Sequence, residues 1–358
     1  MERFKNILVV FNSKTDNQAL FDQVVNLVQR NRAAITVADF IEETPPSLEK
    51  QGVTELTREA QKAIFPIIEE LPNDISITPE TKSGGKELSS GTNAIMESTI
   101  EIQEWIKQEE QRRLEQFISA LQKVGIYPTS KTIFGIPFIE IIREVLLQHH
   151  DLVMITAEGS GSFKETLFGN TTMHLMRKCP CPVWAIKPGQ PKKTNRILAA
   201  VDLSSGDKER VALTKTIMEL ATSLSRLWHS ELLIIHAWSL YGESLLRGRG
   251  GVSNETINEL LRETQDAHRQ WLIELLQQFP LDDLKPEVYL LKGEAGALIT
   301  ELVQAKAIDL IVMGTVSRAG VSGLLIGNTA EKVLHQVDCS VLTVKPEGFI
   351  SPVKPDQR

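Results

Sequence analysis

Short apolar runs alternate with segments of helical spacing along most of this chain, most clearly after residue 195. Five runs rich in β-branched residues predict strands at residues 196–202, 231–238, 286–292, 309–314 and 339–345. Apolar residues at helical spacing predict helices at 207–227, 254–279, 297–307 and 329–337. Because nearly all the strand residues are apolar, the alternation predicts a parallel sheet with helices on both faces.

The same pattern occurs twice in the chain. A shift of 158 residues places "CPVWAIKP" at 181–188 on "CSVLTVKP" at 339–346, "LFGNTT" at 167–172 on "LIGNTA" at 325–330, and "DLVMITAEG" at 151–159 on "DLIVMGTVS" at 309–317. A shift of 190 residues aligns the opening strands, "NILVVFNS" and "RILAAVDLS". The chain is therefore predicted to hold two tandem domains, at 1–190 and 195–346, followed by a tail at 347–358.

The first copy carries extra polar sequence after its second strand, at about residues 42–92. This stretch includes "ETPPSLEK", "PNDISITPE" and "KSGGKELSSGT", which are polar and rich in turn-forming residues. We interpret these pieces as a surface loop inserted into the first domain.

Composition narrows the classes of function. The chain of 358 residues has a net charge of −7 and an isoelectric point near 5.7, so it has no overall attraction for nucleic acid and we expect no DNA partner. Its three cysteines cannot form a disulfide framework, and it has no apolar run long enough to predict membrane insertion. Since "MERFKNILVV" enters a strand pattern without a signal peptide, we expect a cytoplasmic protein.

A glycine-rich segment follows the fourth strand of the second copy. It reads "GTVSRAGVSGLLIGNT" at 314–329 and leads into the predicted helix at 329–337. In open parallel α/β sheets, ligands bind beyond the carboxyl ends of the strands, and a helix start offers backbone N–H groups to an anion. Taken alone, the segment fits a phosphate-binding loop and also plain turn chemistry.

The spacing and flanks of this segment resemble those of the universal stress protein family, in particular its tandem E-type members. The family's nucleotide loop has a glycine, two residues, a glycine, nine residues, and a glycine followed by serine or threonine; Gly314, Ser317, Gly327 and Asn328 hold those positions here. Ser317 and Asn328 depart from the pattern. The runs "LIGNTAEKVL", "CSVLTVKP", "RILAAVDLS" and "HLMRKCPCPVWAIKP" strengthen the resemblance, which covers residues 6–346.

This resemblance implies two tandem Rossmann-like α/β domains of the adenine nucleotide alpha hydrolase-like kind, each a five-stranded parallel sheet flanked by helices. It also implies a stress-response protein that binds ATP, with Mg²⁺ accompanying the nucleotide, in the second copy. Asp202 would contact the adenine and ribose side, Ala200 and Ala237 would shape the adenine pocket, and Gly314 would lie against the ribose. Five residues would surround the phosphates: Ser317, Arg318, Gly327, Asn328 and Thr329.

The first copy diverges at the matching positions. Asn12 stands where the second copy has Asp202, Thr156 replaces the ribose-side glycine, and Glu158 and Glu165 bring carboxylates into or beside the loop. Because a carboxylate repels phosphate, we expect no nucleotide in this copy. Our hypothesis is that it serves as a scaffold or as a pocket for a different ligand.

The remaining chemistry favours binding over catalysis. The sequence has no nucleophile elbow, P-loop or paired metal motif, so we assign no catalytic residue and expect at most slow ATP hydrolysis. Cys179, Cys181 and His174 resemble a set of metal ligands, but the cysteines fit the start of a buried strand better and we expect no metal site. Trp271 is interpreted as an interior anchor of its helix.

Family members often pair through their fifth strands. By resemblance, the segments at 181–187 and 339–345 are expected to form an intrachain pseudo-dimer, and dimerisation of whole chains is compatible with this arrangement. Two alternatives to a nucleotide-responsive binding protein stay open. They are a weak ATPase and an interaction scaffold that binds no nucleotide.

Overall fold

The computed structural model describes residues 3–41, 105, 108–157, 168–189, 193–204, 207–248, 252–315 and 327–355. The insertion predicted at 42–92 lies outside these residues. The chain divides into two units, Met1–Ile41 with Leu114–Arg358, and Glu42–Arg113, and every described strand belongs to the first unit. None of the described helices is both long and apolar enough to cross a bilayer.

Two successive βα arrays make up the first unit, which we call the first half and the second half. The strands of the first half are β1 (Asn6–Phe11), β2 (Ala34–Ile41), β3 (Thr129–Phe134), β4 (Leu152–Thr156) and β5 (Val183–Ile186). Its helices are α1 (Gln18–Asn31), the part of a further helix that covers residues 114–123, α4 (Pro137–Gln148) and α5 (Asn170–Lys178).

The second half has the strands and helices that the sequence pattern predicts, each within a few residues of its predicted ends. The strands are β6 (Arg196–Val201), β7 (Glu231–Trp238), β8 (Glu287–Lys292), β9 (Leu310–Gly314) and β10 (Ser340–Val344). The helices are α6 (Lys208–Trp228), α7 (Glu243–Gly248), α8 (Asn254–Leu276), α9 (Ala295–Lys306) and α10 (Asn328–Gln336). The short helix α7 was not predicted.

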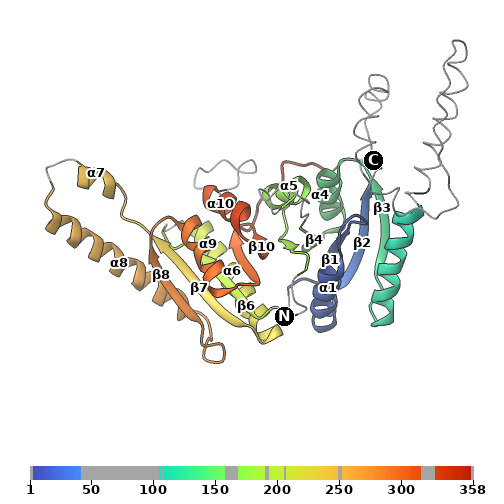
Figure 1. Ribbon diagram of the computed structural model, residues 1–358, viewed down its shortest axis with the longest axis horizontal. Coiled ribbons are helices and arrows are strands. Elements are labelled where there is room, and N and C mark those ends of the chain that lie inside the picture. The colour runs from blue at the N-terminus through green and yellow to red at the C-terminus, as the bar shows by residue number, and fades with distance from the viewer. Residues whose placement is uncertain are drawn as a thin grey trace, which may run out of the picture. The chain divides into compact units, whose positions relative to one another are not determined.

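All ten strands form one sheet in the order β3-β2-β1-β4-β5-β10-β9-β6-β7-β8. Figure 1 shows β3 and β8 at the two opposite ends of this sheet. Neighbours within each half are parallel, whereas β5 and β10, which join the halves, are antiparallel. In each half the first strand lies between the second and the fourth, as in doubly wound α/β folds. The predicted fold class, two tandem Rossmann-like domains with parallel five-stranded sheets, is confirmed.

Alternate residues of the inner strands face two separate cores. In β1, Ile7 and Val9 point into the core covered by α1 and α6, while Leu8 and Val10 point into the core covered by α4, α5, α9 and α10. A strand covered on both faces needs apolar residues at every position, because successive side chains point to opposite faces. Both cores contain residues of both halves.

The two outermost strands depart from the prediction of a sheet covered on both faces. β3 and β8 lie at the ends of the sheet, and none of their residues is fully buried. An edge strand has a neighbour on one side only, and charged residues there disfavour pairing with another chain. Lys131 in β3 and Glu287 in β8 are examples.

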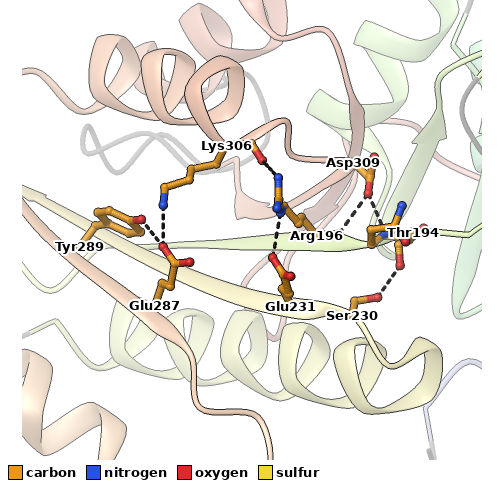
Figure 2. Close-up of polar contacts among 9 residues, drawn as sticks. Thr194, Arg196, Ser230, Glu231, Glu287, Tyr289, Lys306 and Asp309 are labelled. Carbon is orange, nitrogen blue, oxygen red and sulfur yellow. Dashed lines mark hydrogen bonds and ion pairs between the residues drawn. The ribbon is translucent and has the colours of Figure 1, made fainter.

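Polar side chains tie the strands together at their amino ends. In the second half, Asp309 accepts hydrogen bonds from the backbone N–H groups of Asn195 and Arg196, at 2.6 and 3.0 Å (Figure 2). The Arg196 side chain donates to the carbonyl of Lys306 at the end of α9 and to the carboxylate of Glu231, both at 2.8 Å. These contacts lie at the opposite end of the strands from the pocket described below.

The first half repeats this arrangement at the positions that the sequence repeat predicts. Asp151 accepts hydrogen bonds from the backbone N–H groups of Lys5 and Asn6, at 2.5 and 3.0 Å. The Asn6 side chain donates to the carbonyl of Gln148 at the end of α4, at 2.8 Å. The repeat in sequence is therefore also a repeat of contacts.

Buried side chains support the junction between the halves. Trp184 of β5 is 1% exposed and packs against Trp228 of α6, with ring centroids 5.3 Å apart. Lys345, which follows β10, donates to the carbonyl of Met176 in α5 at 2.7 Å and to the hydroxyl of Thr315. Burial lowers the pKa of Lys345 to about 8. The antiparallel strand pair is thus reinforced from both halves.

Candidate functional site

A pocket of about 670 Å³ lies at the carboxyl ends of β6, β7 and β9 in the second half. Because β6 lies between β7 and β9, the connections that follow β6 and β9 run in different directions, which is where open α/β sheets bind ligands. Seven of the predicted nucleotide residues line it: Ala200, Asp202, Ala237, Gly314, Gly327, Asn328 and Thr329. Ser317 and Arg318 lie outside the residues that the structure describes.

Asp202 places a carboxylate on one wall of the pocket, just after β6. It accepts hydrogen bonds from the backbone N–H of Ser204, at 3.0 Å, and from the hydroxyl of the same residue. The Arg210 guanidinium in α6 lies 3.8 Å from its second oxygen. With its side chain 48% exposed, Asp202 is held in place and still reaches the pocket.

The start of α10 forms another wall. Gly327 is its N-cap in an extended conformation, and no side-chain hydrogen bond caps this end of the helix within the described chain. The Gly327 N–H itself donates to the carbonyl of Thr315, at 3.2 Å. The N–H groups at Asn328 and Thr329 have no partner within the helix, and together with the positive end of the helix dipole they suit an anion.

Glu294 is a second carboxylate on the pocket wall, but its oxygens are already engaged. They accept hydrogen bonds from the backbone N–H groups of Gly296 and Ala297, at 2.9 and 3.0 Å, and pair with Lys332 of α10. The Lys332 contact, helped by the two N–H groups, lowers the pKa of Glu294. This residue is therefore the N-cap of α9 and is poorly placed to act as a base.

Two histidines form a buried pair beside the pocket, which sequence reasoning missed. His236 of β7 is fully buried, and its Nε2 lies 2.7 Å from Nδ1 of His268 in α8. His268 lines the pocket and has Trp238 and Trp271 as ring neighbours, at centroid distances of 6.0 and 4.8 Å. Burial lowers the pKa of both histidines, so both are neutral at pH 7.

Trp271 is not the interior anchor that its helical spacing indicates. Its side chain is 42% exposed and meets the edge of the His268 ring, with the ring planes 74° apart. The spacing identifies the side of α8 that faces the sheet, but this helix buries only Ile257, His268, Leu272 and Leu275. Trp271 therefore covers the outside of the histidine pair.

The first half differs at the matching place in its sheet. Asn6 of β1 lies opposite Ala34 of β2, and the equivalent residue Arg196 of β6 lies opposite Glu231 of β7. Six residues further along each second strand, Phe40 of β2 occupies the position that Ala237 has in β7. A phenylalanine ring thus stands where the second half has a methyl group.

Hydrogen bonds within the chain also engage the polar residues of the first half at this end. Thr156 donates to the side-chain oxygen of Asn17 at 3.2 Å, and Asn17 donates to the carbonyl of Asn12 at 2.7 Å. Glu158 and Glu165 lie outside the described residues.

The cysteines lie in a buried, apolar setting. The Sγ atoms of Cys179 and Cys181 are 3.6 Å apart, and this contact together with burial raises the pKa of the Cys181 thiol well above its usual range. His174 stacks on Phe138 with ring centroids 4.3 Å apart. Over the described ranges, no three His, Cys, Asp or Glu side chains are grouped as metal ligands.

Comparison with known proteins identifies relatives along the whole chain. A profile described as the universal stress protein family matches residues 86–187 and 193–345. The chain is 26% identical over 358 residues to universal stress protein E of Photorhabdus laumondii subsp. laumondii, and the match covers 99% of each chain.

Solved structures share the fold. A structure from Pseudomonas aeruginosa UCBPP-PA14 matches with a TM-score of 0.58 and 20% identity, over 97% of this chain and 95% of that chain. A universal stress protein from Archaeoglobus fulgidus DSM 4304 matches with a TM-score of 0.51 and 15% identity, over 95% of this chain and 98% of that chain. At such identities the likeness concerns the fold and not the ligand.

Proposed function

This chain belongs to the universal stress protein family, and on that premise we propose that it acts in the stress response as a binding protein whose second half holds ATP. The observation that supports the proposal is the set of residues that line one pocket. The start of α10, which no described side chain caps, and the carboxylate of Asp202 line the same space of about 670 Å³ at the carboxyl ends of the strands. A volume of this size is typical of small-molecule sites.

The two chemistries in this pocket match the two ends of a nucleotide. The N–H groups at Asn328 and Thr329 would receive the phosphates, and Mg²⁺ would enter with them. Asp202 would accept hydrogen bonds from the ribose hydroxyls. Ala200 and Ala237 leave room for the base at the strand ends.

The arrangement of the two carboxylates in the pocket favours ATP binding without efficient ATP hydrolysis. Glu294 is held by two backbone N–H groups and Lys332, and Asp202 by Ser204 and Arg210. A phosphoryl-transfer enzyme needs a group that positions the attacking water, and neither residue is arranged for this role.

In the first half, we propose that the nucleotide position is closed. The ring of Phe40 stands where the second half has the methyl group of Ala237, and Asn12 supplies no carboxylate where the second half has Asp202. This half would serve as a scaffold, or would bind a different ligand elsewhere on its surface.

Thermal unfolding with and without ATP tests the nucleotide site. ATP at about 100 times its dissociation constant is expected to stabilise the protein by roughly 2.7 kcal/mol and to raise the unfolding temperature. Asp202→Ala is expected to weaken binding measured by calorimetric titration, whereas Asp282→Ala, an exposed aspartate outside the pocket, leaves it unchanged. If neither ATP nor ADP shifts the unfolding temperature, the second half is not a nucleotide site.

A further inference from the structure

A fixed chain of hydrogen bonds runs from the backbone of β6 to the wall of the pocket. The carbonyl oxygen of Val201 lies 3.2 Å from Nδ1 of His236, and Nε2 of His236 lies 2.7 Å from Nδ1 of His268. His236 is fully buried and His268 is 6% exposed. The chain ends at Nε2 of His268.

The direction of each proton follows from the acceptor at the start of the chain. A carbonyl oxygen only accepts, so Nδ1 of His236 carries the hydrogen. In a neutral imidazole the other nitrogen is then an acceptor, and Nε2 of His236 must receive a hydrogen from Nδ1 of His268. Nε2 of His268 is left as a bare acceptor.

This acceptor belongs to a ring whose orientation is fixed. Trp238 stacks on His268 with an interplanar angle of 29°, and Trp271 meets it edge-on. His268 lines the pocket, and its Nε2 makes no hydrogen bond to any described residue. His236, Trp238 and Trp271 all contact the His268 ring. The ring therefore cannot turn its Nδ1–H toward a ligand without breaking the hydrogen bond to His236.

We propose that His268 determines the specificity of the pocket, by accepting a hydrogen bond from an amino group on a planar heterocycle such as the 6-amino group of adenine. This inference rests on the proposed nucleotide site. A polar group that is left unpaired on binding disfavours a ligand without the matching donor more strongly than a missing apolar contact does. The pocket would thus distinguish amino-substituted purines from purines that lack this group.

The charged groups around the pair agree with a neutral acceptor. His236 of β7 contacts His268, Asp202 at the end of β6 acts electrostatically on both rings, and Arg210 of α6 lies 3.8 Å from the Asp202 carboxylate. Asp202 favours protonation, but burial dominates and lowers the pKa of both rings. Protonation of His268 would put a hydrogen on Nε2 and abolish the acceptor.

The test compares two nucleotides on two proteins. Purine riboside 5′-triphosphate lacks only the 6-amino group of ATP, and His268→Phe keeps a ring but removes the acceptor. The full-length wild type is expected to bind ATP about tenfold more tightly than the riboside triphosphate, and His268→Phe is expected to bind both almost equally. His335→Phe, at an exposed histidine of α10, is the matched control and should keep the tenfold preference.

A second variant guards against a folding defect of the phenylalanine protein. In His268→Gln the amide carries a donor and an acceptor spaced much like the two ring nitrogens, so this variant is expected to retain part of the preference for ATP. The wild-type preference should also decrease as the pH falls below the ordinary range of histidine. Because both ligands carry the same triphosphate, its own titration cancels in the ratio.

Three outcomes decide the matter. A preference that disappears in His268→Phe and persists in His335→Phe supports the proposal. A preference of equal size in wild type and in His268→Phe overturns it while leaving the nucleotide site intact. Absence of binding by either nucleotide to wild type overturns both proposals.

Discussion

Gly314 closes β9 at a point where helix and strand come unusually near each other. A β-carbon built on this residue would lie 2.7 Å from Cδ2 and 3.3 Å from Cγ of Leu213 in α6. Both residues line the pocket. The glycine therefore allows α6 to lie against the end of β9, a role that is independent of any ligand.

Replacing this glycine should be destabilising in a way that depends on its neighbour. Gly314→Ala is expected to reduce the free energy of unfolding by about 1–3 kcal/mol, because the leucine side chain must move out of a packed position. Leu213→Ala removes the clashing atoms, so the double variant should be less destabilised than the sum of the two single changes. Urea unfolding of all four proteins measures this coupling.

Gly248→Ala provides a matched control for that cycle. A β-carbon at Gly248 would meet no atom within 4 Å, so this change is expected to have little effect on stability. Strictly additive effects of Gly314→Ala and Leu213→Ala would show that the close approach does not limit the packing.

Single residues of the candidate site were predictable to the extent that they sit at strand ends and helix starts. Asp202 and Gly327 follow from the strand pattern and the family's spacing, and the structure brings both to one pocket. His268 does not follow, because it is a lone histidine in an amphipathic helix and gains its partner His236 only through packing. Phe40 was in principle detectable, since aligning the second strands of the two copies pairs it with Ala237.

At the scale of elements, Asp309 and Asp151 hold the first and fourth strands of each half together at their amino ends. Each accepts two hydrogen bonds from backbone N–H groups at the start of the neighbouring first strand. The ion pair between Arg196 and Glu231 lies beside Asp309 but is exposed, with side chains 40% and 65% accessible (Figure 2). The two kinds of contact should differ in their contribution to stability.

Asp309→Ala is expected to destabilise the protein by about 1–3 kcal/mol, because it leaves two backbone N–H groups at the strand start without their acceptor. Glu231→Ala, which removes only the exposed ion pair, should cost about 1 kcal/mol or less. Asp151→Ala should behave like Asp309→Ala. Urea unfolding of the three variants measures the loss of stability in each. If Glu231→Ala loses as much free energy of unfolding as Asp309→Ala and Asp151→Ala, the prediction is wrong.

Elements were predictable where their residue pattern is set by local geometry. Continuous apolar runs placed the strands of the second half, since each inner strand is apolar on both faces, and helical spacing placed its helices. The helix α7 was missed because its six residues are too few to show a period and none of them is buried. The exposure of β3 and β8 was missed because the order of strands in the sheet decides which strands lie at its edges, and the residue pattern of a single strand does not predict that order.

The whole unit is held together by a sheet and two cores that pass from one half to the other. Trp184 illustrates this, since it belongs to β5 but packs against Trp228 in α6 of the second half. In the other core, which α5 and α10 cover, Arg177 of α5 pairs with Glu331 of α10 at 2.6 Å. Halves that share a core in this way should not unfold independently.

Trp184→Ala is therefore expected to destabilise both halves, and not only the half that contains it. Loss of this buried side chain should cost about 3–5 kcal/mol. Hydrogen exchange followed by mass spectrometry should show faster exchange for peptides of β1 and of β7 alike, because each half unfolds when the shared core is weakened. Trp271→Ala, which removes a tryptophan that is 42% exposed, is the control and should leave exchange in both strands nearly unchanged. If exchange accelerates in β1 and β4 while β7 keeps its protection, the halves fold as separate domains and the continuous sheet contributes little to their stability.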